Sequence, residues 1–443
     1  MSEHSGDVDA VAYEEAVREL FSRRPERIVP GLGRIRAVCE RLGEPQRAFR
    51  AVHITGTNGK TTLAHLVSAL LTAHGVRSGT YTSPHLQEVG ERVRVDGRPI
   101  GRAAFIAALE RLRGPLDEVE HDRGEMVTFF ETLTALAYDH FAAAEVEAAA
   151  VEVGMGGRWD ATNVVDAEVA VINPVRLDHA ELGSTVRDVA WEKAGLIAEG
   201  ATVVLAPQER AADEVITAEA RARGARVRRA GADFAVLGRS AGAAGQTLRL
   251  RVGDVVLDEV ALPLRGGHQA ANAVCAVAAV DALLPGGVDA AAVRSGLASA
   301  RSPGRLEVVA GADRDDVPVV LDGAHNPAGA AALAEAIVRE IPARRRVLVL
   351  AAMGDKDYAG ILDALLPVTD RLVVTQAPTG RSAPAESLGK HAQLAGRDAD
   401  VVLDPAEALA TARAAAEPGD VVVVTGSLYL VGAVRDALGL EVR

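Results

Sequence analysis

The sequence predicts an α/β protein built from two parallel-sheet domains, a larger one followed by a smaller one, and three observations lead to this fold class. Its 443 residues exceed the ~250–300 at which a single hydrophobic core stops growing. From about Arg50, short apolar runs alternate with longer helical patterns, which is typical of a parallel sheet covered by helices. The same alternation starts again after the turn SPGR at Ser302–Arg305. We therefore expect domains at residues 11–304 and 305–443, and a disordered segment at residues 1–10.

The larger domain is expected to hold a doubly wound sheet with an antiparallel insertion. Short apolar runs bounded by turn signals predict buried strands, and Ala-rich segments predict helices. Between Asp233 and Pro263 the apolar runs are separated by Gly-rich turns, which favours an antiparallel insertion or edge. The strands are expected at residues 51–55, 148–153, 168–173 and 201–206, and helices at residues 61–74, 268–284 and 289–300.

The smaller domain is expected to be Rossmann-like. After Arg305 the chain again alternates apolar runs with helical patterns, which predicts a second parallel sheet. Its strands are expected at residues 317–322, 346–353, 371–376, 400–403 and 420–426.

Composition limits the partners and the compartment. The 48 basic and 61 acidic residues give a formal charge of −13, which repels nucleic acid and anionic membranes. No run of ~18 apolar residues occurs, and the acidic N-terminus lacks the basic and apolar segments of a signal peptide. Cys39 and Cys275 are far apart in sequence, so neither a disulfide framework nor a paired-cysteine metal site is indicated. We expect a cytoplasmic protein with no nucleic-acid or membrane partner.

The strongest local signal is TGTNGKTT, residues 55–62, between a predicted strand and a predicted helix. In such a P-loop-type segment, glycines let backbone N–H groups face phosphates and the helix N-terminus adds partial positive charge. Lys60 would reach terminal phosphate oxygens, and Thr61 could ligate Mg²⁺. The strict pattern has Gly where Ile54 stands, so this is a shortened variant, and the competing interpretation is an ordinary strand-to-helix turn. The residues expected to bind nucleotide are Thr57, Asn58, Gly59, Lys60, Thr61 and Thr62.

A second signal lies in the apolar run AAAVEVG, where Glu152 is the one ionisable residue. Strand ends beside a phosphate loop supply Mg²⁺ ligands in parallel-sheet proteins, so Glu152 is a candidate metal ligand. The alternative is a solvated glutamate at a strand edge.

Ten short segments form an ordered series that covers nearly the whole chain after Arg50. They are GTNGKT (56–61), TSPHL (82–86), TFFE (128–131), EVGMGGRWDATN (152–163), DH (178–179), EKAG (192–195), HQAAN (268–272), SPGRLE (302–307), DGAHNPAG (322–329) and TGSLYLVG (425–432). With this series the chain resembles the folylpolyglutamate/dihydrofolate synthase family of the Mur ligase superfamily. TSPHL and DGAHNP, together with the phosphate loop, are its most specific segments.

The resemblance implies an ATP-dependent ligase that joins L-glutamate to a folate-type carboxylate through an acyl phosphate. The acceptor would be dihydropteroate, tetrahydrofolyl-glutamate or both. Three lysine and histidine positions would take part in catalysis: Lys60 at the phosphates, Lys193 as a carbamylated lysine near the second metal, and His325 facing the incoming glutamate.

The resemblance further implies the binding residues. Two Mg²⁺ sites and the nucleotide would share the cleft between the two domains. The matching positions are Thr61, Ser83, Glu152 and His179 for Mg²⁺, and Asn272, Arg305 and Asp322 for ATP.

One stretch departs from the family pattern, because residues 178–185 are one residue shorter than its usual run. Either the loop geometry on the acceptor side differs from that of the family, or, as we favour, the deletion is tolerated next to a turn. Two other functions stay open from the sequence: a Mur-type ligase acting on another carboxylate acceptor, such as a cell-wall nucleotide-sugar peptide, and a nucleotide-dependent switch or ATPase without ligase chemistry. We expect a monomer whose partners are ATP, L-glutamate and the folate or dihydropteroate acceptor.

Overall fold

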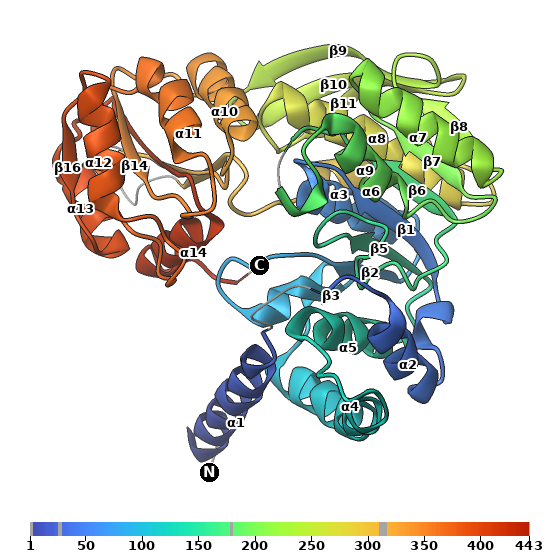
Figure 1. Ribbon diagram of the computed structural model, residues 1–443. Helices are drawn as coiled ribbons and strands as arrows, with labels where there is room; N and C mark the ends of the chain where they lie inside the picture. Colours follow the sequence, from blue (N-terminus) through green and yellow to red (C-terminus); the bar gives the residue numbers. More distant parts are fainter. Residues whose placement is uncertain (1–2, 25–28, 178–179, 310–316, 443) are drawn as a thin grey trace.

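The computed structural model describes residues 3–24, 29–177, 180–309 and 317–442. Within these ranges the strands form an eight-stranded, a three-stranded and a six-stranded sheet. The six-stranded sheet and its helices form a separate lobe, on the left of Figure 1, and the chain before it makes the larger body.

The eight-stranded sheet has the order β4-β3-β2-β5-β1-β6-β7-β8, in which β3 pairs antiparallel with both β2 and β4 and the other pairs are parallel. The central strands are short and apolar on both faces, as in β5, whose five residues are all buried. The strands are β1 (Arg50–Thr55), β2 (Ser78–Tyr81), β3 (Val93–Val95), β4 (Arg98–Pro99), β5 (Ala148–Glu152), β6 (Val169–Ile172), β7 (Thr202–Leu205) and β8 (Arg226–Arg229).

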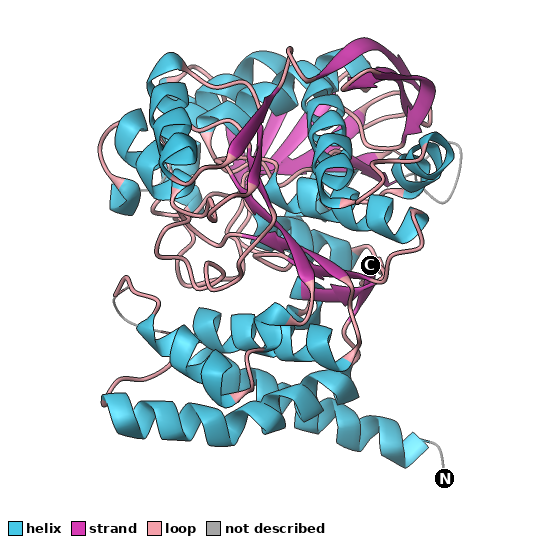
Figure 2. Cartoon of the chain, turned by 90° about the vertical axis from the view of Figure 1, so that its right-hand side faces the viewer, coloured by secondary structure: helices cyan, strands magenta, loops and turns pink. Residues whose placement is uncertain are grey.

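Helices cover both faces of this sheet, which makes it doubly wound (Figure 2). One face packs on α3 and α8, and the other packs on α5 and, towards β7, on α6 and α7. The helices are α1 (Glu3–Ser22), α2 (Gly33–Arg41), α3 (Lys60–Ala73), α4 (Arg102–Arg123), α5 (Phe129–Ala143), α6 (Val186–Ala194), α7 (Arg210–Ala222), α8 (Gly267–Leu283) and α9 (Ala290–Ser299).

The predicted insertion is an antiparallel sheet of β9 (Phe234–Gly242), β10 (Gly245–Val252) and β11 (Val255–Leu262). Its apolar face and the eight-stranded sheet share one core with α8. A helix that contacts sheets on two sides is apolar nearly all round, as α8 is with its run AVCAVAAV.

The six-stranded sheet has the order β12-β13-β17-β14-β15-β16, parallel except for β12 at one edge. Helices α10, α11 and α12 cover one face, and α13 and α14 cover the other. Its elements are β12 (Glu307–Val309), β13 (Val319–Leu321), α10 (Pro327–Glu340), β14 (Arg346–Leu350), α11 (Tyr358–Leu365), β15 (Arg371–Val374), α12 (Ala385–Leu394), β16 (Ala399–Val401), α13 (Pro405–Ala414), β17 (Val421–Thr425) and α14 (Leu428–Ala437).

The α/β class and each predicted strand are confirmed, with boundaries that shift by up to three residues. The structure differs from the sequence-based expectation at the N-terminus, where α1 begins at Glu3 although residues 1–10 were expected to be disordered. Tyr13, Ala16 and Leu20 of this helix are buried in the core beside α4, which gives α1 a packed face. The boundary at residues 304/305 lies between α9 and β12 and stays a prediction.

Candidate active site

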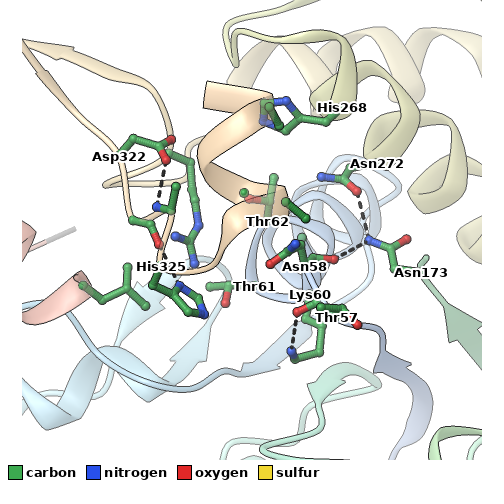
Figure 3. A pocket seen from close by; sticks show the side chains of 18 of the residues that line it. Thr57, Asn58, Lys60, Thr61, Thr62, Asn173, His268, Asn272, Asp322 and His325 are labelled. Atoms are coloured by element: carbon green, nitrogen blue, oxygen red, sulfur yellow. Dashed lines mark hydrogen bonds between the residues drawn. The ribbon is translucent and has the colours of Figure 1, made fainter. Parts of the chain in front are cut away.

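A cavity of about 540 Å³ lies where the carboxyl ends of the central strands of the large sheet face the six-stranded sheet (Figure 3). Ligands of open α/β sheets bind at such strand ends. Nearly all residues predicted for the site line this cavity: Thr57, Asn58, Gly59, Lys60, Thr61, Thr62, Ser83, Glu152, Asn272, Arg305, Asp322 and His325.

The phosphate loop joins β1 to α3, and its glycines are required by geometry. Gly59 has φ 82°, and a Cβ there would lie 2.9 Å from both Asn173 Nδ2 and Asn272 Oδ1. Asn173 Nδ2 donates to Asn58 O at 3.1 Å and to Asn272 Oδ1 at 3.0 Å, which ties the loop to α8. Lys60 Nζ donates to Gly56 O at 3.1 Å, so its ammonium group lies beside the loop backbone.

Glu152 ends β5 directly beside the phosphate loop. Thr61 Oγ1 lies 3.0 Å from both of its carboxylate oxygens, and Ser83 N donates to Oε2 at 3.1 Å. Burial raises the pKa of Glu152, against the lowering effect of Lys60 and of the hydrogen bonds from Ser83 and Thr61. A buried carboxylate next to two hydroxyl side chains is an oxygen-rich set that suits Mg²⁺.

His179, also predicted as a metal ligand, lies outside the described residues. In the part of the chain that the structure describes, no group of three or more His, Cys, Asp or Glu side chains could hold a metal ion. Thr61, Ser83 and Glu152 lie together and offer a few oxygen donors, which suits Mg²⁺ bound at phosphates.

Asn272 lies one turn into α8 and reaches the cavity beside Gln269. Asn272 Nδ2 donates to Gln269 Oε1 at 2.9 Å. Both amides are buried and line the cavity, so they can hydrogen-bond a nucleotide base on this side.

The six-stranded sheet contributes the loop after β13 to the opposite wall. Asp322 accepts hydrogen bonds from Leu306 N at 2.8 Å and from Ala324 N at 2.9 Å, so it shapes this loop. His325 Nδ1 lies 2.8 Å from Gly323 O, and because a carbonyl only accepts, Nδ1 carries the hydrogen. In a neutral ring, Nε2 is then the atom with the lone pair.

Lys193 lies beside the phosphate loop, but it is not one of the described residues that line the cavity. It lies on α6 with a relative exposure of 2%. Its Nζ donates to Gly56 O at 3.0 Å, the same carbonyl that Lys60 contacts. Its carbamylation stays a prediction.

Sequence reasoning missed several residues that line the cavity. Lys356 and Arg381 add two cations on the wall made by the six-stranded sheet, and Asn173 adds the amide that links the phosphate loop to α8. Asn173 is the last residue of the strand predicted at 168–173, and Lys356 and Arg381 come shortly after two other predicted strands, so position at or after the end of a predicted strand was the signal that could have found them.

Comparison with known proteins identifies both halves of the chain. Residues 54–280 match the Mur ligase middle domain, and residues 304–428 match the Mur ligase glutamate ligase domain. A dihydrofolate synthase/folylpolyglutamate synthase of Mycobacterium tuberculosis is 42% identical over 98% of this chain and 95% of its own length. The chain belongs to the folylpolyglutamate synthase/dihydrofolate synthase family. It is accordingly an ATP-dependent ligase, and the resemblance seen in the motifs is confirmed.

Solved structures of this family match the whole fold. Folylpolyglutamate synthase of Mycobacterium tuberculosis in complex with ADP and AMPPCP has a TM-score of 0.93 and 39% identity, over 98% of this chain and all of that one. FolC of E. coli in complex with DHPP and ADP has a TM-score of 0.83 and 31% identity, over 96% and 97% of the two chains.

As for membranes, each helix within the described ranges is too short or too polar to cross one.

Proposed function

We propose that this ligase adds L-glutamate to a folate-type carboxylate, either dihydropteroate or a tetrahydrofolyl-glutamate, in the cytoplasm. One observation carries the proposal: a single cavity holds the phosphate loop and Glu152 on one wall, and His325, Lys356 and Arg381 on the other. An amide-forming ligase needs an activated phosphoryl donor and an amine within reach of the same carboxylate.

The wall of the large domain suits ATP. Backbone N–H groups of the loop and the N-terminus of α3 favour phosphate oxygens, and Lys60 supplies a positive charge. Arg305 lines the cavity from the segment that connects the two sheets, where its planar guanidinium can contact phosphate with two N–H groups.

Thr61, Ser83 and Glu152 are the residues that would hold Mg²⁺. When bound there, the ion would neutralise charge that develops on the phosphoryl oxygens.

The wall of the six-stranded sheet suits glutamate. Glutamate brings two carboxylates and one amine, and this wall offers the cations Lys356 and Arg381 beside the imidazole of His325. We assign the cations to the carboxylates and His325 to orienting the amine.

The reaction then proceeds in two steps. An oxygen of the acceptor carboxylate attacks the γ-phosphorus of ATP, and the bond between this phosphorus and the β–γ bridging oxygen breaks. ADP leaves, and the acceptor becomes an acyl phosphate. The deprotonated amine of glutamate attacks the acyl carbon with its nitrogen lone pair. The tetrahedral adduct expels phosphate, and the nitrogen loses a proton to leave a neutral amide. Lys60 stabilises the charge of the first step, and the enclosing walls keep water from the acyl phosphate.

A substrate panel tests the proposal. Purified protein is incubated with ATP, Mg²⁺, glutamate and, in turn, dihydropteroate, tetrahydrofolate and its monoglutamate, while phosphate release and product mass are followed. A product heavier by one glutamyl residue with at least one of these acceptors is expected. Phosphate release that needs neither acceptor nor glutamate would contradict the assignment.

A further inference from the structure

The antiparallel insertion has no part in the reaction described so far, yet its strand β9 lies next to α10 of the other lobe (Figure 1). Arg239 of β9 forms an ion pair with Glu340, the last residue of α10. The side chain of Glu340 is 3% exposed, so water does not solvate its carboxylate and protein groups must compensate its charge.

The second oxygen of the same carboxylate binds the helix that lines the nucleotide side of the cavity. Glu340 Oε2 accepts a hydrogen bond from Gly266 N at 2.8 Å, and Gly266 is the N-cap of α8. Gln269 and Asn272 lie in the first two turns of α8 and line the cavity. The carboxylate thus connects α10 directly to the start of α8.

The N-cap region of α8 is held by a second contact to the same arginine. Arg239 Nε donates to Gln246 Oε1, and Gln246 Nε2 donates to Leu264 O at 2.6 Å and to Gly266 O at 3.1 Å. The carboxylate therefore binds the N–H of Gly266, and the amide of Gln246 binds its C=O. Both backbone polar groups of Gly266, its N–H and its C=O, are therefore hydrogen-bonded, which fixes the turn before α8.

The position of the Glu340 charge relative to the two helix dipoles shows that it stabilises α8 and not α10. A negative charge at the C-terminal end of a helix opposes the helix dipole, so Glu340 is unfavourable for α10 itself. The same charge at the N-terminus of α8 is favourable. The contact with α8 and Arg239 accounts for a glutamate at this position.

The other end of α10 is also fastened to the large domain. Asn326 is the N-cap of α10, and its Nδ2 donates to Asn58 Oδ1 of the phosphate loop at 3.0 Å. His325 directly precedes it. With 14 residues, α10 spans roughly 20 Å at 1.5 Å per residue. Two attachments so far apart fix the orientation of the helix better than one would.

We propose that Glu340 and Arg239 are a positioning pair that holds α10, and with it the His325 loop, in register with α8 and the phosphate loop. The insertion β9–β11 is then the platform on which the C-terminal lobe docks. Neither residue is among the described residues that line the cavity, so the pair acts through α8 and α10. This inference rests on the proposed function for its kinetic readout.

The test is a double-mutant cycle with two controls. The variants are Glu340→Gln, Arg239→Met and both together. Glu335→Gln removes a carboxylate of α10 whose ion pair among the described residues lies within the same helix, with Arg339 at 2.8 Å. Arg228→Met removes an ion pair to Asp281 at the far end of α8, inside the large domain. The measurements are kcat/KM for glutamate, phosphate released per amide formed, and the radius of gyration from small-angle X-ray scattering.

Each single variant of the pair is expected to lower kcat/KM for glutamate about tenfold, with more phosphate released per amide and a larger radius of gyration. The double variant should lose little more than either single one, because the two residues act as a unit. Both controls should match the wild type. Losses that multiply in the double variant, equal losses in the controls, or a lowered Tm with unchanged kinetics and radius would overturn the proposal. If the wild type itself forms no amide, the proposed function fails, and the radius of gyration alone decides whether the pair holds the lobes.

Discussion

Replacing His325 with alanine tests the assignment of the donor side of the cavity. The imidazole is half-buried, lines the cavity and is fixed through its Nδ1 hydrogen on Gly323 O at 2.8 Å. Its remaining nitrogen is the group that would contact glutamate.

The size of the effect follows from this single contact. A hydrogen bond to a charged ligand contributes about 1.5–3 kcal/mol, so His325→Ala should weaken glutamate use roughly tenfold to a hundredfold. Loss of the hydrogen bond to Gly323 O by itself should lower the free energy of unfolding by about 1 kcal/mol. ATP affinity should barely change, because His325 lies on the wall opposite the phosphate loop.

The assay is steady-state kinetics with glutamate and ATP varied in turn, beside a melting curve. His325→Gln serves as the partner variant, since its amide can replace one hydrogen bond and should recover part of the glutamate dependence. An unchanged KM for glutamate with a lowered Tm would refute the donor-site role and leave His325 as a residue that only supports the loop.

Three further outcomes are expected. Lys60→Ala should lower ligation by about 10²–10³-fold in a folded protein, since it removes a charge at the transferring phosphoryl group; near-normal turnover would contradict the ATP site. If Lys193 is carbamylated, Lys193→Ala should lose activity that short-chain carboxylates partly restore, whereas an unmodified lysine in the intact mass of active protein would remove the claim. Burial lowers the pKa of His53, His65 and His85 from 6.5 to about 3, so unfolded chains bind more protons between these values. The free energy of unfolding should then fall as pH drops below 6.5, by up to about 1.4 kcal/mol per pH unit for each ring. Urea titrations at pH 7, 5.5 and 4.5 measure the free energy of unfolding. If its dependence on pH is the same in His65→Gln as in the wild type, the contribution assigned to His65 is contradicted.

The sequence predicted the parts of the fold that are locally encoded. The central parallel strands are apolar runs between turn signals, and the phosphate loop and Glu152 are consecutive with them. Because parallel strands align their carboxyl ends, finding these strands already placed Lys60, Thr61 and Glu152 at one edge of the sheet.

Elements whose burial comes from distant partners could not be predicted this way. Strand β2 reads SGTY, with no apolar run, yet all four residues are buried because it lies between β3 and β5. Strand β8 reads RVRR and forms an edge that pairs with β7 on one side only. Neither pattern resembles an isolated strand.

The same limit applies to the site. Lys356 and Arg381 have no motif of their own, and although each comes after a predicted strand, their place opposite Lys60 depends on how the lobes pack. The sequence also could not show that Lys193 is buried against Gly56 O, because the residues around it have the pattern of an ordinary solvent-facing helix. The contact of Lys193 with Gly56 joins positions 137 residues apart.

The most direct test of the account follows an oxygen atom. The acceptor is labelled with ¹⁸O in the reacting carboxylate, and the protein turns it over with ATP and glutamate until amide and phosphate can be analysed by mass spectrometry. An acyl phosphate requires that one carboxylate oxygen leaves with the phosphoryl group, so one ¹⁸O per phosphate is expected, with ADP as the other product. Unlabelled phosphate, or label found in AMP, would contradict ligation through an acyl phosphate in this cavity.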